Sequence, residues 1–274
     1  MKFTTPPPQV PNVLLTFPAP HVLLITLNRP AQLNAIPSTQ HAPLAALYDW
    51  YDNEPSLRCA VLTGAGRAFC AGADLKEWDS SNNSLSRKVQ MPPQGFGGLS
   101  NRGGKKPVVA AVNGLCLGGG MEMVVNCDLV VASPKAKFGL PEVKRGVIAV
   151  AGALPRLPGI LGRQRAGEMA LLGRVYSAGE MERWGVVNWV CEEGEDVVGR
   201  AVGVAREVAG NSPDSVVVSR EGLRLGMDGG LGMERATEVL VKGMYGRMEG
   251  GTNMKEGVRS FVEKREAVWV DSKL

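Results

Sequence analysis

The chain has 274 residues, 44% hydrophobic and 21% charged, which excludes a wholly disordered protein and suits one catalytic unit with a substantial core. Its net charge is only +4 and acidic and basic residues are interspersed, so nucleic acid is not an expected partner. The five cysteines form no Cys-x-x-Cys pair, which indicates buried, reduced thiols.

The first predicted unit is a strand followed by a helix. Residues 1–11 are rich in threonine and proline without apolar periodicity, which predicts a loose, flexible extended arm. The β-branched run from Val22 to Leu27 predicts a strand, which the following Asn-Arg-Pro sequence ends. A helix is then expected over 38–53.

Three further apolar runs predict buried strands at 59–63, 108–112 and 129–132. Their alternation with helices predicts an α/β architecture with crossover connections, in which ligands bind at the carboxyl ends of strands. Between them, the Gly-, Pro- and Asn-rich segment 91–106 predicts a surface loop, either a lid over a pocket or a passive linker.

The last part of the chain is predicted to be helical. Ser212 and Pro213 have the pattern of an N-cap and a first helical residue, and helices are expected over 231–248 and 256–268. We place the change from an α/β core (12–205) to a helical region (206–274) near residue 205. This region either forms an oligomer or folds back on the core.

Two segments bear on location. The most apolar stretch, 107–132, is interrupted by polar residues including Glu122, so no membrane span is expected. The final residues Ser272, Lys273 and Leu274 match the carboxyl-terminal address that the peroxisomal import receptor binds. They predict a peroxisomal location, and a frayed, charged tail is the simpler alternative.

Two glycine-containing turns follow predicted strands, one at 71–74 and one at 118–120. Small residues allow a ligand to approach backbone N–H groups, so two such turns could hold one oxygen atom. The simpler alternative is close packing of strand on helix. Neither turn fits a dinucleotide fingerprint or a Walker A loop.

Two carboxylates accompany the turns. Glu122 stands in an apolar run three residues after Gly119, where an ionised group is costly to bury, and Glu142 follows a Gly-Leu-Pro sequence. Paired carboxylates in a dry cleft can divide into an acid and a base. The alternative, a buried core acid and a solvated loop acid, stays open on spacing alone.

Histidine and metal chemistry are not expected. His21 and His41 are far in sequence from the turns, which argues against a His-dependent triad. No Cys, His or Asp cluster has metal-ligand spacing, so no metal is expected.

Together these residues resemble the crotonase (enoyl-CoA hydratase/isomerase) superfamily over residues 20–270. The matching motifs are Leu27-Asn28-Arg29-Pro30, Leu33-Asn34-Ala35, the segments 69–75, 110–114, 118–122 and 138–142, and, in the tail, Glu256-Gly257 and 261–265. The resemblance implies a spiral of ββα units with a carboxyl-terminal helical region that builds homotrimers, often paired into hexamers. It also implies an acyl-CoA substrate, with no cofactor beyond the CoA of that substrate.

The resemblance also implies roles for residues. The backbone N–H groups of Ala71 and Gly119 are expected to form the oxyanion hole, and the substrate or CoA is expected to contact Arg29, Ala71, Gly72, Ala73, Asp74, Leu75 and Gly119. Both acidic positions are glutamate, as in the hydratases, so Glu122 is expected to activate water for C3 of a 2-enoyl-CoA while Glu142 protonates C2. Each transfer is worth roughly 10²- to 10⁴-fold in rate.

One departure concerns the substrate. Hydratases of this superfamily usually carry a Pro-Gly-x-Gly-Gly turn after the second glutamate, and this chain has Val150 in place of a glycine near the water site. The branched side chain is expected to crowd the water or to reshape the acyl pocket. The expected function is an enoyl-CoA hydratase, a hydro-lyase that adds water to a 2-enoyl-CoA or removes it from a 3-hydroxyacyl-CoA, with β-oxidation intermediates among the candidate substrates.

The alternatives are of different classes. One is a specialised acyl-CoA hydratase or dehydratase of secondary metabolism, such as the dehydration of mevalonyl-CoA for siderophores. A Δ3,Δ2-enoyl-CoA isomerase would need Glu142 alone and would tolerate Val150. A third class is an inert CoA-binding protein or one recruited to bind RNA, against which both intact glutamates argue.

Overall fold

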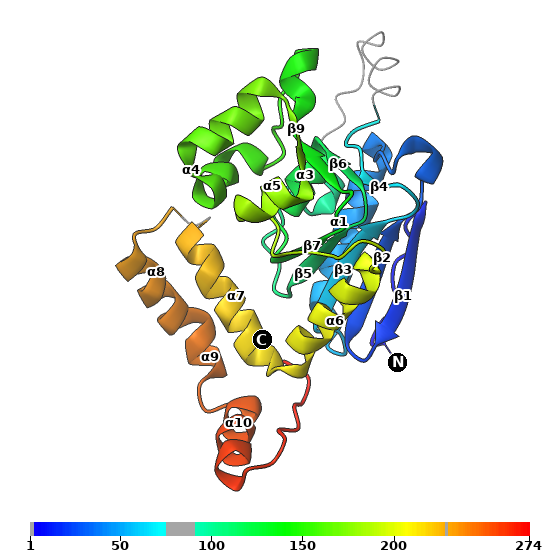
Figure 1. The fold of residues 1–274 in the computed structure, drawn as a ribbon. Coiled ribbons are helices and arrows are strands. Elements are labelled where there is room, and N and C mark those ends of the chain that lie inside the picture. Colours follow the sequence, from blue (N-terminus) through cyan, green and yellow to red (C-terminus); the bar gives the residue numbers. More distant parts are fainter. Residues whose placement is uncertain (1–2, 75–90, 228–229) are drawn as a thin grey trace.

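Two β-sheets form the centre of the protein (Figure 1). The structure is a computed structural model, and it describes residues 3–74, 91–227 and 230–274. The larger sheet has the order β1-β2-β3-β5-β7-β10, and the smaller has the order β4-β6-β8-β9. The strands are β1 (Val13–Ala19), β2 (Val22–Leu27), β3 (Cys59–Gly64), β4 (Ala68–Cys70), β5 (Val108–Val112), β6 (Leu115–Leu117), β7 (Leu129–Ala132), β8 (Lys137–Gly139), β9 (Val175–Ser177) and β10 (Trp189–Val190).

Among the strand pairs of the described residues, β1–β2 and β8–β9 are antiparallel and the others are parallel. β3 and β5 are buried at every residue, which explains their continuous apolar runs. The predicted strands at β2, β5 and β7 match their bounds, and β3 extends one residue further, to Gly64. The sequence reading missed β1, whose alternating burial is that of an edge strand.

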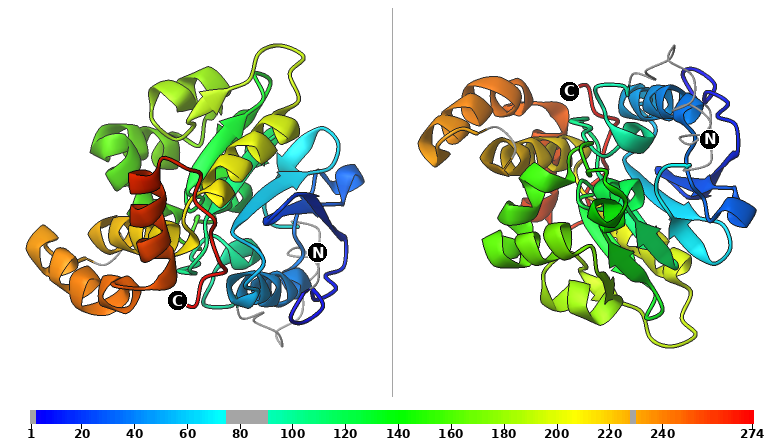
Figure 2. Two further views of the ribbon diagram at one scale, coloured as in Figure 1. Left: turned by 90° about the horizontal axis from the view of Figure 1, so that it is seen from below. Right: turned by 90° about the horizontal axis from the view of Figure 1, so that it is seen from above.

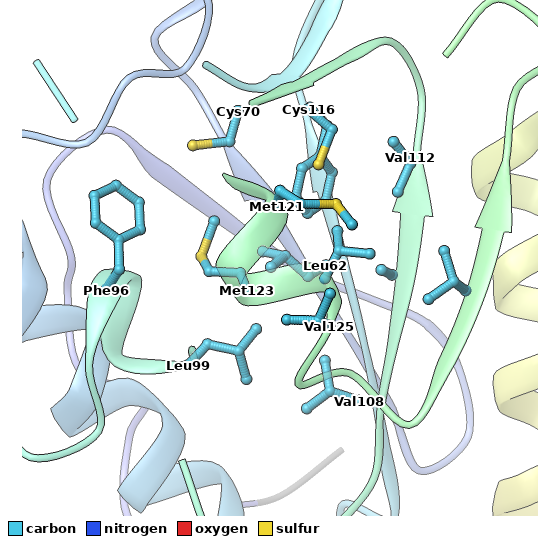
Figure 3. Close-up of a cluster of buried hydrophobic side chains, with 14 of the residues drawn as sticks. Leu62, Cys70, Phe96, Leu99, Val108, Val112, Cys116, Met121, Met123 and Val125 are labelled. Atoms are coloured by element: carbon cyan, nitrogen blue, oxygen red, sulfur yellow. The ribbon is translucent and has the colours of Figure 1, made fainter. Parts of the chain in front are cut away.

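Helices cover both faces of the larger sheet (Figure 2). On one face, α6 (Val197–Gly210) packs four small or β-branched residues at four-residue spacing, Val197, Ala201, Ala205 and Ala209, against β2, β3, β5 and β7. On the other face, α1 (His41–Asn53) and α3 (Gly119–Val124) complete the main core. Met121 lies beside Cys116 in this core, and Met123 lies on the side of Phe96 (Figure 3).

The remaining helices are α4 (Ala153–Leu172), α5 (Ala178–Arg183), α7 (Pro213–Met227), α8 (Met233–Leu240), α9 (Gly246–Met248) and α10 (Thr252–Glu263). The helices α7 to α10 extend away from the sheets (Figure 1). The α6 helix crosses the expected boundary at residue 205 and stays on the sheet to Gly210, so the extension begins at Pro213. No helix in the described ranges is long and apolar enough to span a bilayer.

The helix starting at Pro213 was predicted with its cap, since Ser212 Oγ accepts a hydrogen bond from Ser215 N at 3.4 Å. The segment predicted as one helix over 231–248 is α8, a π-helical turn η5 (Val241–Tyr245) and α9. The prediction of a helix to residue 268 was wrong. Lys264 takes a left-handed conformation with φ of 53°, which ends α10 at Glu263.

The segment 91–106 is not the surface loop that its composition predicted, because its middle part is buried. It forms the 3₁₀ turn η3 (Phe96–Gly98), which packs against α1 and α3. A Cβ atom at Gly98 would lie 2.3 Å from Ala45 N, so glycine allows this close contact. Residues 3–11 form no helix or strand, and Thr4 N donates to Glu54 Oε2 at 2.8 Å, which holds this segment at the end of α1.

Candidate active site

The two glycine turns meet at the ends of β4 and β6. Gly72 has a φ of +96°, and a Cβ atom there would lie 3.3 Å from Gly119 N. Gly118 N donates to Gly139 O at 3.0 Å, which fixes the second turn beside β8. Backbone N–H groups from two separate strands therefore come together, as the motifs predicted.

The first oxyanion donor differs from the predicted one. Ala71 N donates to Leu33 O at 3.0 Å, so its N–H group is already used within the fold. Ala73 lies two residues further, in an isolated bridge with Ile36, and its N–H donates to no group in the described residues. The same holds for Gly119, the first residue of α3, whose N–H has no acceptor within its helix. The donors available to a ligand are Ala73 and Gly119.

Glu122 is held in a fixed position inside the protein. Its neighbours Met121 and Met123 are in the core, and Glu122 itself is only 4% exposed. Its Oε1 atom accepts hydrogen bonds from Ala151 N at 2.8 Å and from Ala153 N at 3.3 Å. Burial raises the pKa of this carboxyl, the two N–H groups oppose the rise, and the charge of Glu142 adds to it.

Glu142 lies in the 3₁₀ turn η4 (Pro141–Arg145) and approaches the second glycine turn. A Cβ atom at Gly118 would lie 3.0 Å from Glu142 Oε1, and Glu142 Oε2 is buried without a hydrogen-bond partner in the described residues. Burial raises the pKa of Glu142, and its own backbone N–H and the Arg145 guanidinium partly offset that rise. An oxygen without a partner at a cavity wall can exchange a proton with a ligand.

A cavity of about 170 Å³ unites these groups. Residues of both turns and both glutamates line it. The other lining residues are His41, Met91, Phe96, Leu117, Pro141, Arg145, Val147, Ile148, Val150 and Ala151. Of the alternative assignment, the buried, hydrogen-bonded acid describes Glu122, but Glu142 is not a solvated loop acid, because it lines the same cavity with one oxygen buried and its charge raises the pKa of Glu122.

His41 and Phe96 were not predicted as site residues. Gly97 N donates to His41 Nδ1 at 3.0 Å, and the two rings lie 4.7 Å apart. This bond leaves Nδ1 unprotonated, so the neutral ring carries its proton on Nε2. No motif in the sequence could reveal this pair, because Phe96 belongs to the segment that was interpreted as a surface loop.

Arg29 supports the first turn and is absent from the cavity wall. Its guanidinium forms an ion pair with Asp74 at 3.1 Å and donates to Ala35 O at 2.5 Å. Ala71, Gly72 and Ala73 line the cavity, while the predicted contact Leu75 lies outside the described residues. Within the described ranges no three His, Cys, Asp or Glu residues gather as metal ligands.

The comparison with known proteins agrees with this geometry. The family model described as Enoyl-CoA hydratase/isomerase matches residues 19–272. The chain belongs to the enoyl-CoA hydratase/isomerase family. The fold is therefore the crotonase-like α/β fold that the motifs predicted, and it extends over almost the whole chain.

Solved structures and curated relatives of this family match along nearly their full length. An enoyl-CoA hydratase from Mycobacterium tuberculosis superposes with a TM-score of 0.83 at 32% identity, covering 96% of this chain and 100% of that one. A probable enoyl-CoA hydratase/isomerase from Mycobacterium abscessus gives 0.84 at 36% identity, covering 95% and 99%.

Two curated relatives have a more specific name. A mevalonyl-coenzyme A hydratase from Beauveria bassiana is 60% identical, and 100% of both chains is covered. Another from Aspergillus fumigatus is 50% identical over 97% of this chain and 98% of its own. With the family match, these relatives make the chain an enzyme of the hydro-lyase class.

Proposed function

We propose that this enoyl-CoA hydratase family member interconverts mevalonyl-CoA and its 2-enoyl-CoA by losing or gaining water. The observation that carries the proposal is the arrangement of the two carboxylates in one cavity with two available N–H donors. Two mevalonyl-CoA hydratases that match along nearly their whole length support the substrate. They favour the secondary-metabolism alternative over a general β-oxidation hydratase.

In the dehydration direction, the thioester oxygen accepts hydrogen bonds from Ala73 N and Gly119 N. Glu142 removes a proton from C2, and the electron pair moves onto the thioester oxygen as an enolate. Each well-placed donor to that oxygen is worth about 2.7 to 4 kcal/mol. The enolate then forms the C2–C3 double bond as the C3 hydroxyl leaves, and Glu122 supplies the proton that makes it water.

Hydration is the reverse of these steps. Glu122 must be ionised to take a proton from water as its oxygen attacks C3, while Glu142 must be protonated to deliver a proton to C2. The hydrogen bonds to the two carboxyl groups differ in a way that fits these roles, because two N–H groups favour the ionised form of Glu122. Glu142 Oε2 has no such donor in the described residues.

The test is turnover of mevalonyl-CoA beside straight-chain and branched 3-hydroxyacyl-CoA and 2-enoyl-CoA thioesters, followed by enoyl absorbance and product mass. Loss or gain of one water, fastest with mevalonyl-CoA, is expected. Glu122→Gln and Glu142→Gln should each lower kcat by roughly 10²- to 10⁴-fold. Double-bond migration that survives Glu122→Gln would instead support the isomerase. Binding of CoA thioesters without turnover would contradict both the hydratase and the isomerase assignments.

We also propose that the chain is peroxisomal and forms a homo-oligomer. Ser272, Lys273 and Leu274 match the peroxisomal address, and apolar side chains of α10 are exposed on the helical extension. A fluorescent protein fused ahead of the full chain should collect in peroxisomes, and removing the last three residues should leave it in the cytosol. Unchanged peroxisomal collection after the removal would refute the role of the tripeptide.

A further inference from the structure

The loop that joins η4 to α4 holds the Glu122 carboxylate and the main chain of Glu142 through its backbone N–H groups. Ala151 N donates to Glu122 Oε1 at 2.8 Å, and Val147 N donates to Glu142 O at 3.2 Å. Ser100 Oγ donates to Ala151 O at 2.7 Å, which anchors the loop from outside. Side chains on this loop therefore have defined positions relative to the reacting atoms.

The side chains of this loop are apolar, and two of them, Ile148 and Val150, are largely exposed. Val147, Ile148 and Val150 line the cavity, and Ile148 and Val150 are 61% and 78% exposed. Exposed valine and isoleucine are unfavourable next to water, and an apolar part of a ligand would remove them from it. Because valine is branched at Cβ, its side chain is restricted in rotation and presents a defined shape.

Val150 is also adjacent in sequence to Ala151, which holds the carboxylate of Glu122 in position. Ala151 donates to Glu122, and in the proposed reaction Glu122 exchanges a proton with the oxygen on C3. The other substituents of C3 must then lie near this loop. We propose that Val150, assisted by Ile148, forms a subsite for an alkyl branch at C3, so that the enzyme selects 3-alkyl-3-hydroxyacyl-CoA substrates over those with hydrogen at C3.

This inference rests on the proposed function for its account of C3, but its test does not require turnover. Isovaleryl-CoA and butyryl-CoA differ by one methyl group at C3 and cannot exchange water. Their affinities for the full chain can be measured by calorimetry. About 0.8 kcal/mol per buried methyl-sized group corresponds to roughly fourfold tighter binding of isovaleryl-CoA to the wild type.

The variants are Val150→Ala, which keeps a side chain, and Val150→Gly, which restores the residue usual in hydratases. Both should lower the affinity ratio towards one. In turnover, the preference for 3-methylcrotonyl-CoA over crotonyl-CoA should fall by roughly 10-fold or more. Val143→Ala is the matched control, because Val143 is also a partly exposed valine on the neighbouring turn but packs near Gly173 and not in the cavity.

Each outcome decides one point. An affinity ratio that is unchanged in both Val150 variants, or a wild type that prefers butyryl-CoA, overturns the branch subsite. Absence of water transfer with every thioester, combined with a ratio that still depends on Val150, overturns the proposed function and leaves the subsite in place. Thermal melting of each variant shows whether a loss of affinity comes from unfolding.

Discussion

The two glutamates illustrate how single residues acquire different chemistry from similar burial. Glu122 receives two backbone N–H groups, whereas Glu142 has a buried oxygen without a partner in the described structure and a nearby cation, Arg145. Since hydration needs Glu122 ionised and Glu142 protonated, its rate should have a bell-shaped pH dependence. The acidic and basic limbs of this pH profile report the titration of Glu122 and Glu142 together, because the two groups interact.

Arg145→Gln should move the basic limb of the hydration profile to higher pH. The Arg145 charge lowers the pKa of Glu142, so its removal raises that pKa and keeps the proton on Glu142 as pH increases. The measurement is kcat/KM for hydration against pH. Lys144→Gln is the control, since it removes the same charge at the adjacent position; equal shifts in both variants would contradict a specific effect of Arg145.

Gly118→Ala should lower kcat by roughly 10²-fold or more. The new Cβ atom would lie 3.0 Å from Glu142 Oε1 and would push this carboxylate, the general acid or base, out of position. Gly118 also has a φ of +54° with a ψ of −125°, which side chains avoid. Gly146→Ala is the control: its φ is +68°, but nothing lies within 4 Å of its added Cβ. Similar losses of kcat in both variants would mean that backbone strain alone is responsible.

Glu122 could be singled out in the sequence because it interrupts an apolar run, where an ionised group is costly to bury. Spacing alone left the role of Glu142 open, and its expected role came from the family resemblance. The sequence analysis predicted Ala71 as the oxyanion donor, whereas the structure leaves the N–H of Ala73 available. The Ala71 N–H donates to Leu33 O, and this contact between distant parts of the chain could not be predicted from the local sequence. His41 was not predicted because its neighbours Phe96 and Gly97 lie in the segment that was interpreted as a surface loop.

At the scale of elements, the buried parallel strands were predictable because burial on both faces demands continuous apolar runs. The segment 91–106 was not, because glycine and proline favour a turn whether or not the turn is buried. Its burial depends on the close approach of Gly98 to α1, which is a tertiary contact. The end of α10 depends likewise on the left-handed Lys264.

The close packing of α6 gives a prediction about stability. Ala205 is fully buried against the sheet, so Ala205→Leu should overfill the contact and lower the free energy of unfolding by about 1 to 3 kcal/mol. Denaturant unfolding would measure the change. The control Arg206→Leu places the same side chain at the adjacent exposed position and should change stability by less than about 0.5 kcal/mol. Comparable losses would show that α6 does not pack as described.

At the scale of the whole molecule, the helical extension is fastened to the body by the end of the chain. After α10, Trp269 Nε1 donates to Gly210 O at 2.9 Å and Lys105 Nζ donates to Leu274 O at 3.1 Å. Ser272 Oγ donates to Asp214 on α7. Leu274 of the proposed address therefore lies against the body and Ser272 lies against α7, so in the proposed import a receptor would displace these contacts before it binds the tripeptide.

The extension also presents apolar residues that the body does not cover. Phe261 and Val262 on α10 are 85% and 72% exposed, which is unfavourable for a monomer and suits a contact between copies of the chain. Because an isologous or cyclic contact repeats in every subunit, one substitution alters all the interfaces of the assembly at once.

Phe261→Glu should therefore dissociate the proposed oligomer, since it places a carboxylate in each apolar contact while leaving an already exposed position of the subunit exposed. Size-exclusion chromatography with light scattering at micromolar concentration would show a fall in mass towards the 29.1 kDa of one chain. Arg67→Glu adds a carboxylate at an exposed turn between β3 and β4 and should leave the mass unchanged. A wild type that is already monomeric would refute the oligomer, and an oligomer that survives Phe261→Glu would place its interface on another surface.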